Sequence, residues 1–158
     1  MSERIEELKK EYDLNKHVEG GSFVKVYTAP FEDMGRAYMG SIYFLLEKDE
    51  LSHFHKIDCD EIWYYHEGCG MKITVLSDFG KEEFLLGDDL QNGERAMVVI
   101  PKGRVFGAEN LQSDGYTFVS CVTTPNFEYS GFRLIGENEI KDRFEEHYEE
   151  VKKLAFKE

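Results

Sequence analysis

The stretch SHFHKIDCDEIWYYHEGCG, Ser52 to Gly70, carries the strongest chemical signal in the chain. Side chains of an extended strand alternate between its two faces, so His53 and His55 are predicted to share one apolar, inward face. After a short turn, a second strand begins with Glu61. If Glu61 faces the same interior as the two histidines, three groups that bind metals or transfer protons converge. The stretch therefore predicts a pocket between strands.

Working outward, the rest of the chain reads mainly as strands separated by turns. The predicted strands span residues 40–46, 52–57, 61–66, 71–77, 83–86, 95–100 and 116–124. Their spacing of about ten residues, with Gly, Asp and Asn at the breaks, indicates a sandwich or barrel instead of βαβ units. Residues 96–100 are apolar on both faces, which predicts cover on each side, from the barrel interior and from another sheet or a second copy.

Both ends of the chain show helical spacing of apolar residues. We expect a helix at about 3–12 and another at about 138–155, with the barrel at about 20–135. The second helix carries Ile140, Phe144, Val151 and Leu154 on one stripe. A length of 158 residues is enough for one sizeable core, so a single domain over residues 1–158 is expected.

The net charge of the chain limits the kinds of partner that it can bind. The formal net charge is −13 and the isoelectric point is about 4.8, which argues against nucleic acid and against anionic membranes. The N-terminus lacks the apolar run of a signal peptide, and no later stretch reaches transmembrane length. We therefore expect a cytoplasmic protein with no nucleic-acid or membrane partner.

Two short motifs resemble those of the cupin superfamily. The first motif, His-x-His, a spacer, Glu and a later Gly, is matched by His53, His55, Glu61 and Gly68. The second motif is matched by Pro101, Gly103 and Asn110, with Phe106 at the place of its histidine ligand. The spacer before Glu61 is one residue longer than usual in cupins.

The chain resembles more narrowly the cupin type five subfamily, long labelled a domain of unknown function. The matching segments are HVEGG (17–21), SIYFLL (41–46), FH (54–55), DEIW (60–63), LG (86–87), VIPKG (99–103) and PNF (125–127). Val18 and Asn126 replace a customary proline and glycine; the aromatic at 106 is usual in the subfamily, whereas His53 is an addition. The resemblance implies a double-stranded β-helix, or jelly roll, usually a homodimer, with a ligand-sized cavity and no settled activity.

Three functions are compatible with these residues. In the first, His55 transfers a proton, Glu61 orients it, and Tyr65 or Tyr43 acts on the opposite face of a sugar, a sugar nucleotide or a keto acid, as in an isomerase or epimerase. In the second, the cavity is a non-catalytic binding or regulatory site for a metabolite. In the third, His53, His55 and Glu61 hold a divalent Fe, Mn, Ni or Zn ion as the cofactor of an enzyme.

A small-molecule ligand is the expected partner in each case. Aromatic rings can stack on such a ligand while polar tips orient it. The candidate substrate-binding residues are Trp63, Phe106, Tyr43, Phe23, His17 and Glu19.

Overall fold

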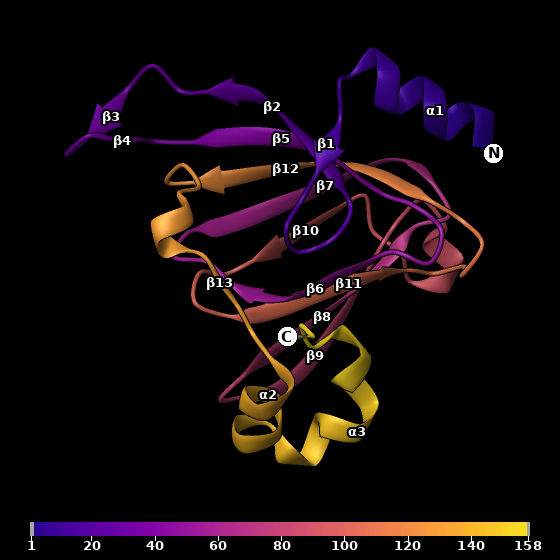
Figure 1. Ribbon diagram of the computed structural model, residues 1–158, viewed down its shortest axis with the longest axis vertical. Coiled ribbons are helices and arrows are strands. Elements are labelled where there is room, and N and C mark those ends of the chain that lie inside the picture. Colours follow the sequence, from indigo (N-terminus) through magenta and orange to yellow (C-terminus); the bar gives the residue numbers. More distant parts are fainter. Residues whose placement is uncertain (1, 158) are drawn as a thin grey trace.

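The computed structural model describes residues 2–157 and consists mainly of two antiparallel sheets that face each other (Figure 1). One sheet has six strands in the order β1-β2-β5-β12-β7-β10, and the other has five in the order β13-β6-β11-β8-β9. Most neighbouring strands are distant in sequence, which is the connectivity of a jelly roll. The predicted all-β class, a double-stranded β-helix with helices at both ends, is confirmed.

The residue ranges of the strands show which parts of the sequence form each sheet. The six-stranded sheet holds β1 (Asn15–Lys16), β2 (Ser22–Thr28), β5 (Gly40–Leu46), β12 (Thr117–Thr124), β7 (Asp60–Gly68) and β10 (Met97–Ile100). The five-stranded sheet holds β13 (Arg133–Leu134), β6 (Leu51–Lys56), β11 (Val105–Asn110), β8 (Met71–Ser77) and β9 (Gly80–Leu86). A short hairpin of β3 (Glu32–Asp33) and β4 (Arg36–Ala37) joins β2 to β5, and single 3-10 turns lie at η1 (Leu90–Asn92) and η2 (Tyr129–Gly131).

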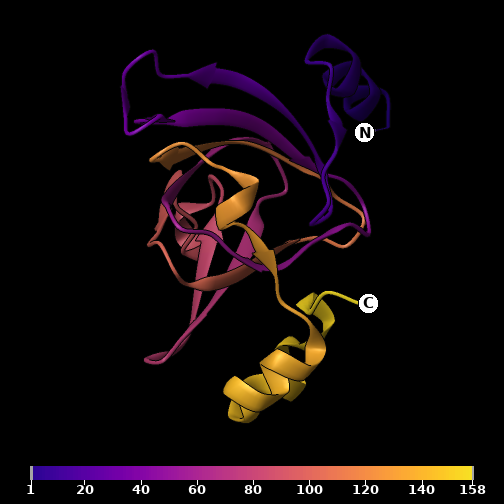
Figure 2. The same cartoon turned by 60° about the vertical axis from the view of Figure 1, so that its left-hand side comes forward.

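Helix α1 (Ser2–Glu11) covers the outer face of the six-stranded sheet. Its Ile5 and Leu8 are buried against Leu45 of β5 and Phe118 of β12. Figure 2 shows α1 and the C-terminal helices at opposite ends of the molecule, so each covers a different sheet. No helix within residues 2–157 combines the length and the apolar character needed to cross a membrane.

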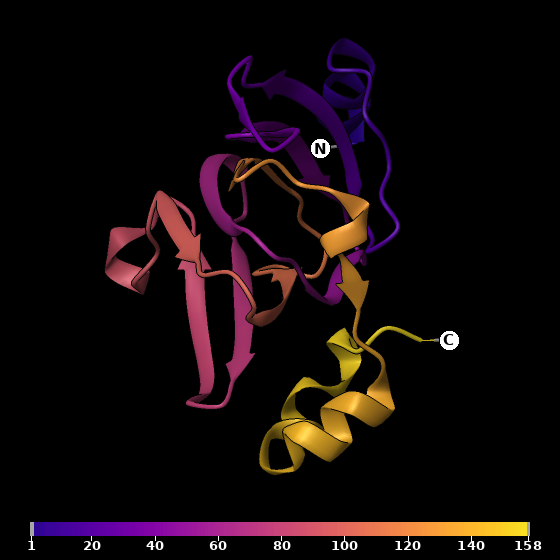
Figure 3. The same ribbon diagram turned by 90° about the vertical axis from the view of Figure 1, so that its left-hand side faces the viewer.

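The C-terminal segment is not the continuous helix expected over 138–155. It consists of α2 (Glu137–Arg143), η3 (Glu145–His147), α3 (Tyr148–Val151) and η4 (Lys152–Leu154), and it lies outside the strands (Figure 3). The helix breaks at Phe144, whose φ of −132° and ψ of 41° are not helical. A straight helix would carry the chain away from the barrel, whereas here Phe156 returns and donates its N–H to the carbonyl of Ile135. The predicted apolar stripe is nevertheless buried against the five-stranded sheet.

Strand β11 was absent from the sequence-based expectation because Gly107 interrupts its apolar pattern. The glycine is required there: a Cβ atom would lie 2.8 Å from the carbonyl oxygen of Ser52 on β6. The pairing register of β11 and β6 shifts at this point, where β6 accommodates one extra residue.

Strand β10 confirms cover of residues 96–100 from the barrel interior only, and cover of their other face by a second copy stays a prediction. Val98 and Ile100 are buried in the core, but Met97 and Val99 on the other face are 47% and 44% exposed. The reason is that β10 is the edge strand of its sheet and that, within residues 2–157, no helix packs over its outer face.

Candidate functional site

A cavity of about 60 Å³ lies between the two sheets at one end of the core. His55 reaches it from β6 of the five-stranded sheet, and Glu61 reaches it from β7 of the six-stranded sheet. His17 and Glu19 enter from the loop between β1 and β2. A space of this size has room for about five water molecules, so it can enclose a molecule or a group of only a few non-hydrogen atoms.

The pairing register of the strands places the remaining residues of the cavity wall next to one another. Lys25 pairs with Ile42, and Ile42 pairs with Cys121, so these three side chains lie side by side on the inner face of the six-stranded sheet. One step further along the strands, Thr123 pairs with Glu61. The loop after β12 closes the space with Asn126, Phe127 and Tyr129.

The most tightly bonded pair in the cavity is His55 with Glu19. Nε2 of His55 lies 2.8 Å from Oε2 of Glu19, and Nδ1 donates to the carbonyl oxygen of His53 at 2.8 Å. A carbonyl oxygen can only accept, so Nδ1 carries a proton, and a carboxylate at Nε2 holds a second one there. Both ring nitrogens of His55 are therefore occupied, which leaves none free for a ligand.

The contact between His55 and Glu19 keeps both side chains charged. Burial by itself disfavours the charged form of His55, but the negative charge and hydrogen bond of Glu19 outweigh it and raise the pKa of the imidazole. Burial likewise disfavours the charged form of Glu19, and the charge and hydrogen bond of His55 outweigh it and lower the pKa of the carboxyl. Glu19 is thus an ionised carboxylate held in the cavity wall by an imidazolium.

The loop that carries Glu19 is shaped by close backbone contacts. The carbonyl of Glu19 accepts from the backbone N–H of His53 at 2.8 Å and from Nδ1 of its ring at 2.9 Å. Gly20 follows with φ of +113°, and a Cβ there would lie 1.8 Å from the carbonyl oxygen of Leu51. Only glycine allows the loop to approach β6 this closely.

His17 is the neutral member of the cavity. Its Nδ1 accepts the backbone N–H of Glu19 at 3.2 Å, so its proton is on Nε2. Burial lowers the pKa of its ring, and the positive charge of His55 acts in the same direction, although the charge of Glu19 opposes both. A neutral imidazole with a donor at Nε2 suits the orientation of a ligand oxygen.

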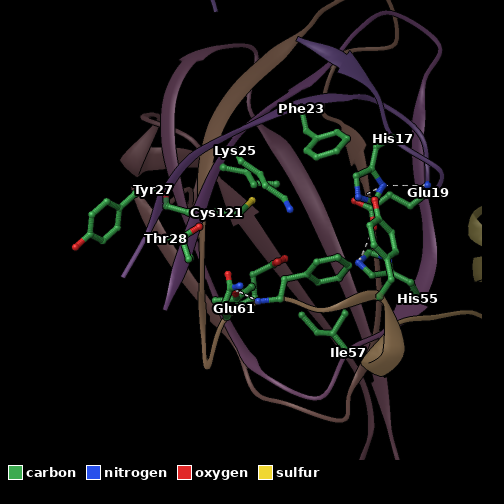
Figure 4. Close-up of a pocket in the computed structure, with 17 residues that line it drawn as sticks. His17, Glu19, Phe23, Lys25, Tyr27, Thr28, His55, Ile57, Glu61 and Cys121 are labelled. Atoms are coloured by element: carbon green, nitrogen blue, oxygen red, sulfur yellow. Dashed lines mark hydrogen bonds and ion pairs between the residues drawn. The ribbon is translucent and has the colours of Figure 1, made fainter. Parts of the chain in front are cut away.

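Glu61 lies apart from this network. It is buried, and no residue within 2–157 forms an ion pair with its carboxyl group. Burial raises the pKa of Glu61 to about 7, and the negative charge of Glu19 adds to the rise, whereas the charge of His55 and the indole N–H of Trp63 oppose it. Figure 4 shows Glu61 well away from the cluster of His17, Glu19 and His55. The cavity therefore holds two carboxyl groups in opposite states near neutral pH.

Five of the residues expected at a site line the cavity: His17, Glu19, Phe23, His55 and Glu61. The expected partnership of His55 with Glu61 is not found, because Glu19 occupies Nε2 of the imidazole. Glu19 was expected only among the substrate-binding residues. Its position in the chain, 36 residues before His55, gave no sign of this contact.

Two other expected residues on β7 do not reach the cavity. Tyr65 is half-buried, and its hydroxyl donates to the carbonyl of Gly68 at 2.7 Å. Four residues of extended strand place it about 13 Å beyond Glu61, so it cannot act in the same space. Trp63 is fully buried in the core against Phe44 and Phe106.

Tyr43 and Phe106 are also outside the cavity lining. Tyr43 points to the outer face of β5, where it packs against Tyr12 and Phe118 beside α1. Phe106 is fully buried and supports His55 from behind, with ring centroids 4.2 Å apart. Phe106 therefore holds the imidazole of His55 in place and does not line the cavity.

The expected shared face of His53 and His55 is wrong. The extra residue of β6 between Ser52 and His55 interrupts the alternation. His53 turns outward, where its ring lies against Phe156, while His55 points inward.

The expected divalent metal ligands therefore do not come together. His53 is outside the cavity, both nitrogens of His55 are occupied, and Glu61 stands alone. In the part of the chain described here, no three His, Cys, Asp or Glu side chains are arranged to hold a metal ion. The donor set does not suit the metal that the cupin resemblance suggested, and we derive no chemistry from one.

Several lining residues were missed by the sequence reasoning, chiefly Lys25, Tyr27, Phe127 and Tyr129. A signal existed for the first two. Alternation along 22–28 places Lys25 and Tyr27 on the same face as Phe23, which was already expected at the site. The segment PNF at 125–127 was noted as a matching motif, but no role was assigned to it.

The rim of the cavity is fastened by Arg36 of β4. Its guanidinium donates to both carboxylate oxygens of Asp58, at 3.1 and 2.8 Å, and its Nε donates to the carbonyl of Asn126 at 2.8 Å. Arg36 thus connects the β3–β4 hairpin, the turn before β7 and the loop that carries Phe127 and Tyr129.

Comparison with known proteins places the chain among uncharacterized relatives. It is 29% identical to the uncharacterized protein YML079W of Saccharomyces cerevisiae, over 87% of this chain and 78% of that protein. The structure of protein SO0799 from Shewanella oneidensis superposes with a TM-score of 0.91 at 36% identity, covering 97% of this chain and 98% of that one.

A more distant likeness concerns the fold alone. Oxalate decarboxylase of Bacillus subtilis, a protein with Mn(II) centers, superposes with a TM-score of 0.59 at 18% identity, over 92% of this chain and 38% of that one. Residues 6–135, most of the chain, match the sequence model of the family described as Cupin superfamily (DUF985). The confirmed resemblance makes this chain a member of that cupin family.

Proposed function

We propose that the cavity binds a small polar metabolite and that Glu19 and Glu61 transfer protons on it, as in an isomerase or an epimerase. The observation that carries the proposal is the pair of buried carboxyl groups whose environments drive their pKa values apart. Such a separation is how one site provides an acid and a base at the same pH.

The two carboxyl groups have complementary roles. Glu19 is ionised beside His55 and can accept a proton from a carbon next to a carbonyl group. Glu61, with a pKa of about 7, is substantially protonated near neutrality and can return a proton to the ligand. They project from different elements, the β1–β2 loop and β7, so the proton can leave from one side of the ligand and return at another. His55 acts as a positioning residue that keeps Glu19 charged.

The walls favour this chemistry. Phe23, Ile42, Ile57 and Phe127 line the cavity and limit its water, which strengthens electrostatic interactions within it. The enclosed volume of about 60 Å³ is too small for a whole sugar nucleotide. A nucleotide-linked substrate would have to leave its nucleotide outside, past the exposed Tyr27.

The test is exchange of carbon-bound hydrogen with solvent. Small aldoses, ketoses, keto acids and sugar nucleotides are incubated with the protein in D₂O, and proton NMR follows the loss of each C–H signal. We expect at least one compound to exchange, and Glu61→Gln to slow that exchange by about 100-fold or more. Glu82→Gln, which removes an exposed carboxylate on β9, is the matched control and should keep the full rate.

The alternative function is a passive binding or regulatory site. It is supported by the occupied nitrogens of His55, which leave no free histidine base in contact with a ligand. A compound that raises the melting temperature without exchanging any hydrogen would favour this alternative over proton transfer. Absence of both binding and exchange across the panel would overturn the proposed function.

Homodimer formation stays a prediction. The exposed Met97 and Val99 on edge strand β10, together with Tyr64 on the neighbouring β7, give a second copy an apolar surface to cover. Light scattering of wild type and Val99→Lys would test it, since only a dimer formed through this face should dissociate in the variant.

A further inference from the structure

Lys25 is a cation on the inner face of a sheet. Its register partner on β5 is Ile42, which faces the core, and Phe23 two residues earlier lines the same cavity. Figure 4 shows the amino group of Lys25 turned into the cavity. Lys25 is itself exposed, so its amino group lies at the open side of the cavity, where a ligand can reach it.

No side chain within the described residues 2–157 compensates Lys25. It forms no salt bridge and no hydrogen bond there, whereas Lys16 and Lys81 each pair with carboxylates. Glu61 lines the same cavity from β7, and no ion pair joins it to Lys25. A ligand that enters the cavity therefore has both groups in its wall.

Counting charges around the cavity gives a net positive site. Glu19 and His55 cancel each other, His17 is neutral, and Glu61 is largely protonated below its pKa of about 7. Lys25 remains as one uncompensated positive charge, in a chain whose formal net charge is −13. An anion would be repelled by most of this molecule, so a local cation is needed to bind one.

We infer that the cavity takes a small monocarboxylate, such as a hydroxy acid or keto acid, whose carboxylate docks on Lys25 and whose oxygen-bearing carbon faces Glu19 and Glu61. One lysine matches one negative charge. A phosphate dianion generally needs an arginine fork, the N-terminus of an α-helix or several backbone N–H groups, and within the described residues neither an arginine nor an α-helix lines this cavity.

The size of the cavity agrees with this class. About 60 Å³ holds a handful of non-hydrogen atoms, which is the size of a three- or four-carbon acid. The inference deepens the proposed function by naming the substrate class of the same cavity, but carboxylate binding itself requires no proton transfer.

The test compares isosteric pairs that differ only in charge: pyruvate with pyruvamide, and L-lactate with L-lactamide. Binding is measured by saturation-transfer NMR and by calorimetry, with inorganic phosphate as a third anion. We expect at least one carboxylate to bind about tenfold more tightly than its amide. Lys25→Met should abolish that preference, and Lys25→Arg should keep part of it.

Lys10→Met on α1 is the matched control, because it removes one exposed positive charge away from the cavity. Equal binding of acids and amides, an unchanged preference in Lys25→Met, or tighter binding of phosphate would each overturn the inference, as would no binding of any carboxylate. The two proposals fail separately. Hydrogen exchange on a neutral compound would support proton transfer and contradict the role of Lys25. Lys25-dependent binding of a carboxylate without exchange would support the role of Lys25 and contradict proton transfer.

Discussion

The space between the two sheets has two ends with different chemistry. At the packed end, formed by Phe44, Trp63, Met71, Leu86 and Phe106, large apolar side chains are fully buried against one another. At the cavity end, formed by His17, Glu19, Lys25, His55 and Glu61, titratable groups surround an open volume. The two are only two residues apart on β7, between Glu61 and Trp63. Burial thus serves stability at one end and sets protonation states at the other.

The largest expected effect is at the packed end. Trp63→Ala removes a fully buried side chain that contacts Phe44 and Phe106. We expect it to lower the free energy of unfolding by about 3–5 kcal/mol, measured by urea denaturation. Phe79→Ala, at a residue that is 90% exposed, should change it by no more than about 0.5 kcal/mol. Similar losses of unfolding free energy in the two variants would contradict the assignment of Trp63 to a packed, stabilising end of the interior.

The next effect is a pH dependence from the cavity end. The pKa of Glu61 rises from 4.5 in the unfolded chain to about 7 in the folded protein. The folded state binds this proton more tightly, so stability is fully present below pH 4.5 and is lost as the pH rises through about 7. The loss is at most about 3.5 kcal/mol, at about 1.4 kcal/mol for each pH unit.

Glu61→Gln isolates that loss, because glutamine does not titrate. We expect the urea midpoint of the variant to rise relative to that of the wild type as the pH is raised from 5 to 8. The raised pKa of His55 destabilises both proteins at higher pH, and most of this effect cancels in the difference because Glu61 is the smallest of its causes. A difference that stays constant with pH would show that Glu61 titrates like an exposed carboxyl group.

The smallest effect concerns the rim of the cavity. Arg36→Met removes the bonds to Asp58 and to the carbonyl of Asn126. These groups are partly exposed, so we expect a stability loss of only about 1 kcal/mol or less. Amide hydrogen exchange in residues 126–131 should nevertheless become faster. Arg143→Met, which breaks a surface pair with Glu139, is the control and should leave that segment unchanged.

Much of the fold could be predicted from the sequence. Regular strand spacing and the short cupin-like motifs led to the jelly roll, and the terminal helical patterns led to helices outside it. Strand β11 was missed because Gly107 looks like a break although close contact with Ser52 requires it. The C-terminal helix was expected as one piece because spacing alone does not record that Phe156 must return to Ile135.

The site was less accessible to sequence reasoning. Alternation assigned His53 to the cavity, but an extra residue in β6 turns it outward, and such a bulge has no reliable signature in one sequence. The contact of His55 with Glu19 depends on how a glycine loop folds back on β6. Lys25 could have been found, since alternation from Phe23 places it on the face that lines the cavity.

The most direct test of the account is a carbon-13 NMR titration of the glutamate carboxyl groups in the wild type and in His55→Asn. The account predicts that Glu61 titrates near pH 7, that Glu19 titrates below the usual 4.5, and that loss of His55 raises the pKa of Glu19. Glu61→Gln and Glu19→Gln assign the two signals. If both carboxyl groups titrate together near 4.5, the cavity holds no separated acid and base, and proton transfer by this pair is contradicted.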